Sequence, residues 1–220
     1  DFETLDELLR GISAVGEITR RTTDNVAAFG EMLSSKIVAA AFEARGLQGV
    51  HVDSRDVLVT DSAYMQAVPQ YEETNLRLKD RVEPLLKAGR VPVMGGFIGA
   101  NRAGITTTIG RGGSDFSAAI FGAGLGAERI EIWTDVDGIL TTDPRVCPDA
   151  RRIKVISFDE AAELAYFGAK VLHPATVLPA IQKNIPVYVL NSRNPGCEGT
   201  RITTRAPHSK NIFKAIAAKK

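Results

Sequence analysis

Strand-like segments alternate with helix-like segments along most of this 220-residue chain. Short runs rich in β-branched and aromatic residues are followed by stretches whose apolar residues recur at helical spacing. The strand-like runs are 49–54, 91–99, 104–110, 129–134 and 185–191, and the helix-like stretches are 22–46, 71–89, 114–126, 157–170 and 173–184. This alternation is typical of a parallel sheet with helices on both faces. We therefore predict an α/β fold, a three-layer α/β/α sandwich with a mostly parallel central sheet.

The most regular helical pattern lies in segment 22–46. Thr23 or Asp24 can cap its start, and Gly46 can end it. One apolar side is predicted to face the core, and its members are Val26, Phe29, Leu33, Ile37 and Ala41.

Two further helix starts carry capping signals. Ser114 is a candidate N-cap for segment 114–126. Ser157 and Glu160 have the spacing of a capping box at the start of segment 157–170.

Composition and charge are ordinary for a globular domain. The chain is 44% hydrophobic and 24% charged, with a net charge of +1, so no global field favours nucleic acid or an anionic membrane. Two cysteines, Cys147 and Cys197, form neither a disulfide framework nor a metal-binding spacing. No apolar run reaches the roughly 20 residues of a membrane span, and no signal peptide is visible. We expect a cytoplasmic protein without nucleic-acid or membrane partners.

The stretch "TTTIGRGGSDFSAAI", residues 106–120, joins a strand to a helix through glycines. Free N–H groups and the dipole at a helix N-terminus favour an anion there. Arg111 adds a planar fork suited to a carboxylate or a phosphate. Asp115 can stabilise the helix or hold a nearby ammonium. A plain glycine-rich turn with a solvated arginine is the competing interpretation.

A second polar cluster, "WTDVDGILTTDPR", follows the strand at 129–134. It lies at the carboxyl end of that strand, where open α/β sheets bind ligands. Its carboxylates can face a Mg-nucleotide, although an Asp-rich turn is also common turn chemistry. Its polar members are Thr134, Asp135, Asp137, Asp143 and Arg145.

Three more positions have weaker signals. Lys170 in "FGAKVLHP" reads by default as a surface lysine, and His173 before Pro174 reads as a capping or packing residue. Glu31 lies in the middle of a helix, in "FGEMLSS", where it is unusual on a buried face and ordinary on an exposed one.

Together these stretches resemble the aspartate kinases of the amino-acid kinase family. The resemblance spans residues 22–204, in the family order and spacing. The matching segments are "FGEMLSS", "GGFIGANRAGITTTIGRGGSDFSAA", "IWTDVDGILTTDPR", "FGAKVLHPAT" and "NPGCEGT". It implies an amino-acid kinase-like fold and transfer of the γ-phosphoryl group of ATP, with Mg²⁺, to the side chain of L-aspartate. The product, 4-phospho-L-aspartate, starts the biosynthetic branch to lysine, threonine and methionine.

The resemblance also implies roles for the residues of the glycine-rich turn. Arg111 would bind the α-carboxylate of aspartate and Glu31 its ammonium, while Gly112, Gly113 and Ser114 would present backbone and hydroxyl donors.

The remaining site positions carried over by the resemblance concern the phosphate and the nucleotide. Asp115 would be a catalytic residue that organises lysines. The nucleotide would contact Thr134, Asp135, Leu140, Arg145, Lys170 and Val171, and Lys170 would also be catalytic by reaching the phosphates. Many relatives have Tyr where this chain has Leu140. No residue is assigned as a direct metal ligand.

Two segments found in relatives are absent from this sequence. Relatives begin with a strand and a K-F-G-G-T-S segment, and they end in regulatory domains of the ACT type. We therefore expect 1–204 to be a partial catalytic domain without its N-terminal strand, inactive alone, and 205–220 to lead toward an absent ACT-type domain. The full-length protein would be a homodimer.

Two alternatives remain open at this stage. Another amino-acid kinase, of the glutamate or N-acetylglutamate type, shares the fold, although Glu31 with Arg111 favours a free α-amino acid. A non-catalytic ligand-binding or assembly module is the alternative from a different functional class.

Overall fold

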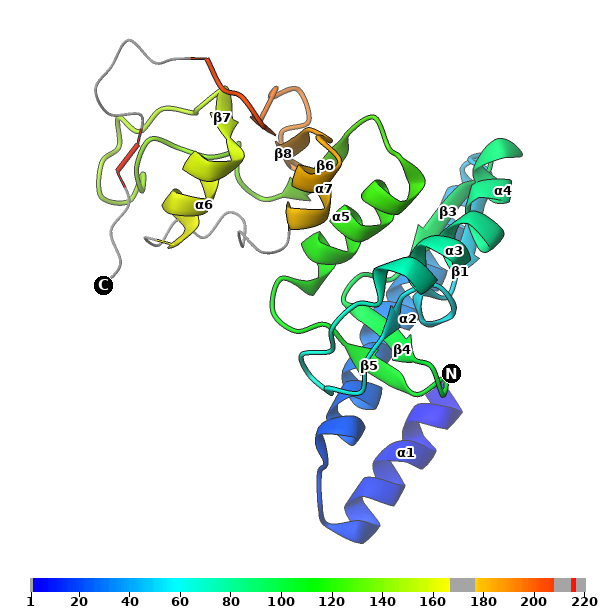
Figure 1. Ribbon diagram of the computed structural model, residues 1–220. Helices are drawn as coiled ribbons and strands as arrows, with labels where there is room; N and C mark the ends of the chain where they lie inside the picture. Colours follow the sequence, from blue (N-terminus) through cyan, green and yellow to red (C-terminus); the bar gives the residue numbers. More distant parts are fainter. Residues whose placement is uncertain (1, 167–176, 208–214, 217–220) are drawn as a thin grey trace. The chain divides into compact units, whose positions relative to one another are not determined.

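The computed structural model describes residues 2–166, 177–207 and 215–216 (Figure 1). The chain divides into two compact units, residues 1–117 and 118–220. Each unit has its own strands and helices and is described by itself.

The first unit contains four helices and five strands among its described residues. The helices are α1 (Phe2–Val15), α2 (Arg20–Ala44), α3 (Tyr71–Arg81) and α4 (Glu83–Lys87), with a 3₁₀ turn at Ser54–Asp56. The strands are β1 (Gly49–Val52), β2 (Val59–Thr60), β3 (Val91–Met94), β4 (Ile98–Asn101) and β5 (Thr106–Thr108). Helix α5 (Gly113–Leu125) begins in this unit and continues into the second.

The second unit contains the remaining described elements. Its strands are β6 (Ile130–Thr134), β7 (Val155–Ser157), β8 (Val187–Asn191) and β9 (Thr200–Thr203). Its helices are α6 (Phe158–Tyr166) and α7 (Leu178–Gln182).

The predicted α/β class is confirmed, and most strand pairs are parallel. β1 pairs with β3, β2 with β4, β6 with β8, and β7 with β9 in parallel. β4–β5 and β8–β9 are antiparallel. The described strands form three separate sheets rather than one continuous sheet. β5 is antiparallel to β4 because the four residues between them are too few for a helical crossover.

The segment predicted as one strand, 91–99, is two strands in the structure. β3 and β4 are separated by Gly95, Gly96 and Phe97, and they belong to different sheets. Phe97 has a φ of +69°, a left-handed conformation that interrupts the strand. Gly95 and Gly96, together with Phe97, therefore form a turn between two strands inside an apolar stretch of sequence.

The predicted buried face of helix α2 is wrong. The buried residues are Asp24, Ala28, Met32, Ser35 and Ala39, whereas Ile37 is 68% exposed. Three of these five residues, Ala28, Ser35 and Ala39, have small side chains, which suits a helix that packs closely on β1 and β5. The N-cap is Thr19, whose side chain accepts a hydrogen bond from the N–H of Thr22, so neither Thr23 nor Asp24 caps the helix.

The two other capping predictions have different outcomes. The capping box is confirmed, because Ser157 N–H donates to Glu160 Oε2 at 2.8 Å and Glu160 N–H donates to Ser157 Oγ at 3.1 Å. Ser114 is not an N-cap, because helix α5 already begins at Gly113 and Ser114 is an exposed residue of its first turn.

The main apolar core lies in the second unit, between its sheet and its helices. Ile130, Ile132, Val187, Val189 and Ile202 from neighbouring strands pack with residues of α5, α6 and α7. A smaller cluster in the first unit joins Ala28 and Met32 of α2 to Ile98 of β4.

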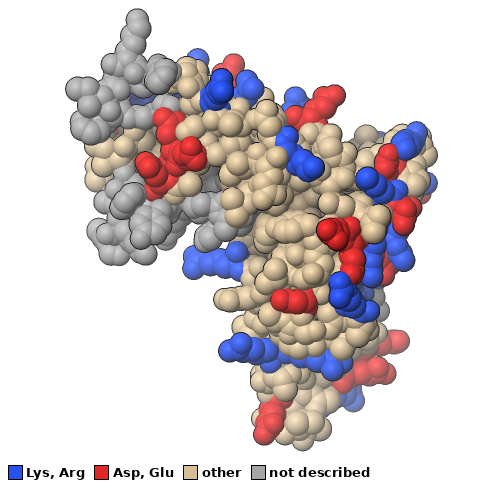
Figure 2. Space-filling model, viewed as in Figure 1, with Lys and Arg blue, Asp and Glu red and all other residues tan. Residues whose placement is uncertain are grey.

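The surface charge is mixed. On the face shown in Figure 2, acidic and basic side chains are interspersed, in line with the net charge of +1. Among the described residues, no helix has both the length and the apolar character needed to cross a lipid bilayer.

Gly49→Ala should destabilise the protein because α2 and β1 touch at this position. A Cβ at Gly49 would lie 2.7 Å from Phe42 Cβ and 2.8 Å from the Ala39 carbonyl oxygen. Overpacking of this kind costs about 1–3 kcal/mol. Urea unfolding of the variant measures the loss.

The matched control is Gly30→Ala in α2, where a Cβ would have nothing within 4 Å. This variant should gain roughly 0.5–1 kcal/mol, because alanine is the better helix former. Equal effects of the two substitutions would contradict the close approach of α2 to β1.

Candidate functional site

The glycine-rich stretch forms a tight turn between β5 and α5. Gly110 and Gly112 have φ values of +81° and +73°, in the left-handed region that glycine adopts without strain. The N–H of Gly113 donates to the Gly110 carbonyl at 3.1 Å, which closes the turn where the helix begins. A hollow of about 340 Å³ lies over this turn, and it is lined by Phe97, Gly110, Arg111, Gly112, Gly113, Ser114 and Asp115.

The start of α5 is held by Phe97. A Cβ at Gly113 would lie 2.8 Å from Phe97 Cδ2 and 3.0 Å from Phe97 Cα, so only glycine fits there without a shift. The Phe97 N–H donates to Ser117 Oγ at 2.9 Å, and that hydroxyl donates to the Gly113 carbonyl at 2.8 Å. The helix N-terminus, where N–H groups lack helical partners, is therefore fixed at the hollow.

The diglycine turn brings Glu31 into the neighbourhood of this hollow. A Cβ at Gly95 would lie 3.3 Å from Glu31 Cβ and 3.2 Å from the Glu31 carbonyl oxygen. A Cβ at the next residue, Gly96, would lie 2.9 Å from Ser114 Cα. One two-residue turn thus touches α2 at Glu31 and α5 at Ser114, so a small ligand in the hollow lies within reach of the helix that carries Glu31.

Two charged groups of the hollow have no ionic partner within the described part of the chain. Arg111 is exposed and makes neither a hydrogen bond nor an ion pair there. Asp115 is partly buried, and burial raises the pKa of its carboxyl group above the ordinary value. A cation brought next to Asp115 would favour the charged carboxylate.

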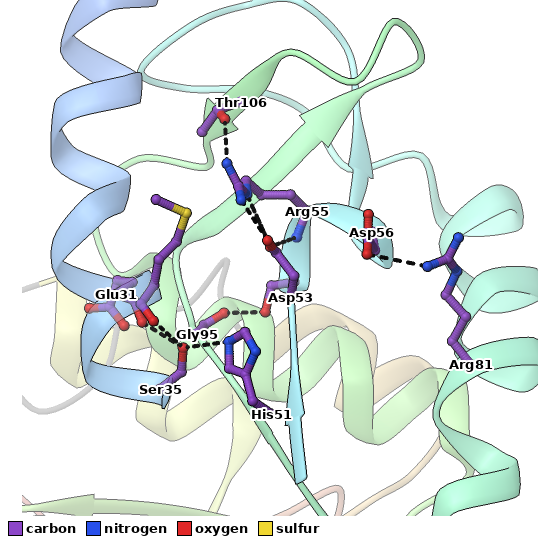
Figure 3. A network of polar contacts seen from close by, with 11 residues as sticks. Glu31, Ser35, His51, Asp53, Arg55, Asp56, Arg81, Gly95 and Thr106 are labelled. Atoms are coloured by element: carbon purple, nitrogen blue, oxygen red, sulfur yellow. Dashed lines mark hydrogen bonds and ion pairs between the residues drawn. The ribbon is translucent and has the colours of Figure 1, made fainter. Parts of the chain in front are cut away.

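A polar network attaches α2 to the strands beside the hollow (Figure 3). Ser35 Oγ lies 2.7 Å from the Glu31 carbonyl oxygen, to which it donates, and 3.2 Å from His51 Nε2. Burial lowers the pKa of His51, and the nearby Asp53 carboxylate opposes that shift.

The network continues through an ion pair on the 3₁₀ turn. Arg55 Nη2 lies 2.6 Å from Asp53 Oδ2, and Arg55 Nη1 donates to Thr106 Oγ1 at 3.3 Å. Burial would raise the pKa of Asp53, but the hydrogen bonds and charge of Arg55 outweigh it, so that pKa lies below its ordinary value. This pair anchors the first residue of β5.

The second polar cluster lies at the carboxyl ends of two paired strands in the second unit. Thr134 ends β6 and Asn191 ends β8, and these two residues are register partners. Asn191 Nδ2 donates to Asp137 Oδ1 at 2.8 Å. The N–H and the hydroxyl of Ser192 donate to the Thr134 carbonyl at 2.8 and 3.0 Å. The loop after β8 therefore holds the loop after β6.

The predicted nucleotide-binding residues of this cluster differ in their exposure and in the partners that they already contact. Asp135 is exposed and accepts a hydrogen bond from Thr134 Oγ1 at 3.3 Å. Arg145 already forms a fork with Asp143, at 2.7 Å for the ion pair, so a phosphate would have to compete for it. Leu140 is partly buried and joins an isolated antiparallel bridge.

Sequence reasoning missed Asn191 and the diglycine turn as parts of the sites. Asn191 ends a strand beside the one that ends in Thr134, and adjacent parallel strands bring their carboxyl ends together. Gly95 and Gly96 fall inside the strand that the sequence predicts at 91–99. The predicted residues Lys170 and Val171, with His173, lie outside the described residues.

The described residues contain no group of three or more His, Cys, Asp or Glu side chains able to hold a metal ion. Mg²⁺ is commonly held by one or two carboxylates together with substrate phosphates. Isolated carboxylates such as Asp115 and Asp135 fit that mode of binding.

Comparisons with known proteins agree on one family. The sequence profile described as "Amino acid kinase family" matches residues 5–191. Lysine-sensitive aspartokinase 3 of Escherichia coli (strain K12) is 40% identical over 223 residues, covering 99% of this chain and 49% of that protein. Aspartokinase 1, chloroplastic, of Arabidopsis thaliana is 40% identical over 224 residues, covering 100% of this chain and 39% of that protein.

Solved structures show the same similarity. The crystal structure of E. coli aspartokinase III in complex with aspartate and ADP has a TM-score of 0.87 and 40% identity, covering 98% of this chain and 49% of that chain. The structure of Clostridium acetobutylicum aspartate kinase has a TM-score of 0.79 and 29% identity, covering 99% and 46%. The chain spans about half the length of these relatives or less.

Asp115→Asn should change the pH dependence of stability. Because the folded protein raises the pKa of Asp115 above 3.8, the contribution of this carboxyl group is fully present below the unfolded pKa. It is lost as pH rises through the raised folded pKa. The stability of the Asn variant relative to the parent should therefore increase as pH rises from the ordinary aspartate pKa through the raised pKa of the folded protein. Urea unfolding at several pH values measures it.

The control is Asp159→Asn, which removes an exposed carboxylate from the first turn of α6. This control measures how the loss of a carboxylate at a helix N-terminus changes stability when the carboxylate is exposed rather than buried. A stability of Asp115→Asn relative to the parent that falls as pH rises would contradict the role of burial.

Proposed function

We propose that this chain, which belongs to the amino acid kinase family, forms most of the catalytic domain of an aspartate kinase. The observation that carries the proposal is the hollow at the start of α5, where Arg111 and Asp115 lack partners within the described residues. Similarity to aspartokinases over nearly the whole chain supports it. The reaction would be transfer of the γ-phosphoryl group of ATP to the side-chain carboxylate of L-aspartate.

The first unit would bind L-aspartate. Arg111 would take the α-carboxylate through its planar fork, and Glu31 would take the ammonium group. Gly112, Gly113 and Ser114 would offer donors at the helix N-terminus. The close packing at Gly95 and Gly96 supports this division, because it keeps the backbone of Glu31 near the first turn of α5.

The proposed reaction needs no general base to activate the acceptor. An aspartate side chain has a reference pKa of about 3.9, so the acceptor is already ionised at neutral pH. One of its oxygens forms the new bond to phosphorus while the bond to the β-γ bridging oxygen breaks and ADP leaves. Catalysis then consists of bringing two anions together and neutralising the transferring charge. Asp115 would hold lysine side chains for that purpose. Burial raises the pKa of its carboxyl group, and a lysine ammonium placed beside it would favour the charged carboxylate.

The second unit would bind the nucleotide. Thr134 and Asp135 lie at the carboxyl end of β6, a position suited to ligand binding in α/β sheets. Leu140 and Arg145 follow in the same loop, and Lys170 and Val171 complete the set proposed from the family resemblance. Lys170 would reach the phosphates and act in catalysis.

Further features of the proposal concern cofactor, assembly and location. Mg²⁺ would accompany ATP and supply positive charge at the phosphates when bound. Residues 1–204 would be the catalytic portion and 205–220 would lead to an ACT-type domain. We also propose a homodimer for the full-length protein and a cytoplasmic location, with no nucleic-acid or membrane partner.

Arg111→Lys in the full-length protein should damage aspartate use far more than ATP use. Lysine keeps the charge but lacks the fork, and loss of such a contact costs about 1.5–3 kcal/mol, or roughly ten- to a hundredfold in KM for aspartate. Arg111→Ala should be worse. A coupled assay that varies ATP and L-aspartate separately gives both KM values.

Arg102→Lys is the matched control, because Arg102 is an exposed partner of Glu73 in the same unit. It should leave both KM values unchanged. If Arg111→Lys instead weakens ATP and spares aspartate, the turn is a phosphate cradle and the assignment of the aspartate site is wrong.

A further inference from the structure

A buried carboxylate outside the proposed site ties together the elements that form it. Asp24 of α2 is 1% exposed. Its Oδ1 accepts a hydrogen bond from Thr108 Oγ1 at 2.7 Å, and its Oδ2 accepts one from the Thr108 N–H at 3.0 Å. The Met65 N–H also donates to it, at 2.9 Å to Oδ2. Donors from two separate segments therefore converge on one side chain.

Both segments border the glycine-rich turn. Thr108 is the last residue of β5, directly before the turn. Met65 has a φ of +71°, an unusual conformation for a residue with a side chain, and a Cβ at Gly110 would lie 3.1 Å from the Met65 carbonyl oxygen. Asp24 thus holds the turn from the strand side and from the loop side.

The same helix carries Glu31, seven residues further along. Seven residues make almost two helical turns, so Asp24 and Glu31 lie on nearly the same side of α2, about 10.5 Å apart along its axis. Ser35 and its contact with His51 fix the helix beyond Glu31. Asp24 fixes the helix before Glu31, and its partner Thr108 belongs to the strand that leads into the glycine-rich turn.

A carboxylate at this place is expensive to bury and has a specific effect. Burying a charged or polar group is tolerated only when hydrogen bonds satisfy it, and here both oxygens are satisfied by donors that a hydrophobic side chain would leave unpaired. The contact therefore sets where β5 lies along α2, rather than adding nonspecific packing.

We propose that Asp24 is a positioning residue for the aspartate subsite: it fixes the glycine-rich turn, with Arg111, at a set place relative to Glu31. The inference rests on the proposed function. It predicts that damage at Asp24 affects recognition of the amino acid, whose two charged groups are held by two different elements, more than recognition of the nucleotide.

The test compares Asp24→Ala and Asp24→Asn with the parent in the full-length protein. The alanine variant removes every acceptor, so KM for L-aspartate should rise about ten- to a hundredfold, the effect of misplacing a binding group by about 1 Å. KM for ATP should stay unchanged. The asparagine variant should recover most of the loss, because its amide oxygen can accept the N–H groups of Thr108 and Met65.

Asp61→Ala is the matched control. Asp61 accepts the N–H groups of Ala63 and Val68 at 3.0 and 2.9 Å in the loop that contains Met65, but it contacts neither α2 nor β5 through these bonds. Its removal should lower stability without changing KM for L-aspartate.

If Asp24→Ala does not fold, Thr108→Val offers a milder variant that tests the same contact. It removes only the hydroxyl donor to Asp24 and should raise KM for L-aspartate while sparing KM for ATP. Combined with Asp24→Asn, its effect should be less than additive, since both act through one contact.

Three outcomes would overturn the positioning role: unchanged KM for L-aspartate in the Asp24 and Thr108 variants, equal rises in both KM values, or a rise in Asp61→Ala as large as in Asp24→Ala. Each of these requires a parent protein that phosphorylates L-aspartate. A parent without that activity would overturn the proposed function itself, so the two failures are distinguishable.

Discussion

Close approach of backbone segments at glycine is the constraint on which the first unit depends. Gly95, Gly96 and Gly113 each lie where a Cβ would come within about 3.3 Å of another segment. Gly95 touches α2 at Glu31, Gly96 touches Ser114 in the first turn of α5, and Gly113 at the start of α5 touches Phe97. A methyl group at Gly96 or Gly113 would force a shift in the elements that line the hollow, because packed interiors leave little slack for an added carbon, whereas at Gly95 a neighbour would have to give by a few tenths of an ångström.

Two carboxylates around the hollow have hydrogen-bond or ionic partners, whereas the two charged groups that line it have none among the described residues. The carboxylates that position elements, Asp24 and Asp53, are fully engaged by donors or by an arginine. Arg111 and Asp115, at the hollow itself, have no such partner among the residues that the structure describes. Arg111 is exposed, so water solvates its charge, whereas Asp115 is partly buried and burial raises the pKa of its carboxyl group. A carboxyl group in this setting beside a pocket is a candidate for ligand binding.

Much of the outline could be predicted from sequence because it follows from local chemistry. The alternation of elements predicted the α/β class, and Ser157 with Glu160 predicted a helix start that depends on residues three apart. Predictions failed where a distant segment decides the outcome. Ile37 was expected inside because its spacing is helical, but α2 packs closely on β1 and β5 through a different face, which includes Ala28, Ser35 and Ala39. Gly95 and Gly96 were placed inside one strand, 91–99, because their neighbours are apolar, but the structure has two strands there.

The sequence by itself determined the chemistry available at the site: a guanidinium, a carboxylate and bare backbone at a helix N-terminus, in an order that resembles one enzyme family. These are properties of residues adjacent in the chain. Only the tertiary structure decided which distant groups join them. It placed Glu31 across a two-residue turn from Ser114, and it buried Asp24 against Thr108, 84 residues away. The physical reason is that hydrogen bonds and close contacts between segments depend on how the chain packs, and no local pattern encodes the partner.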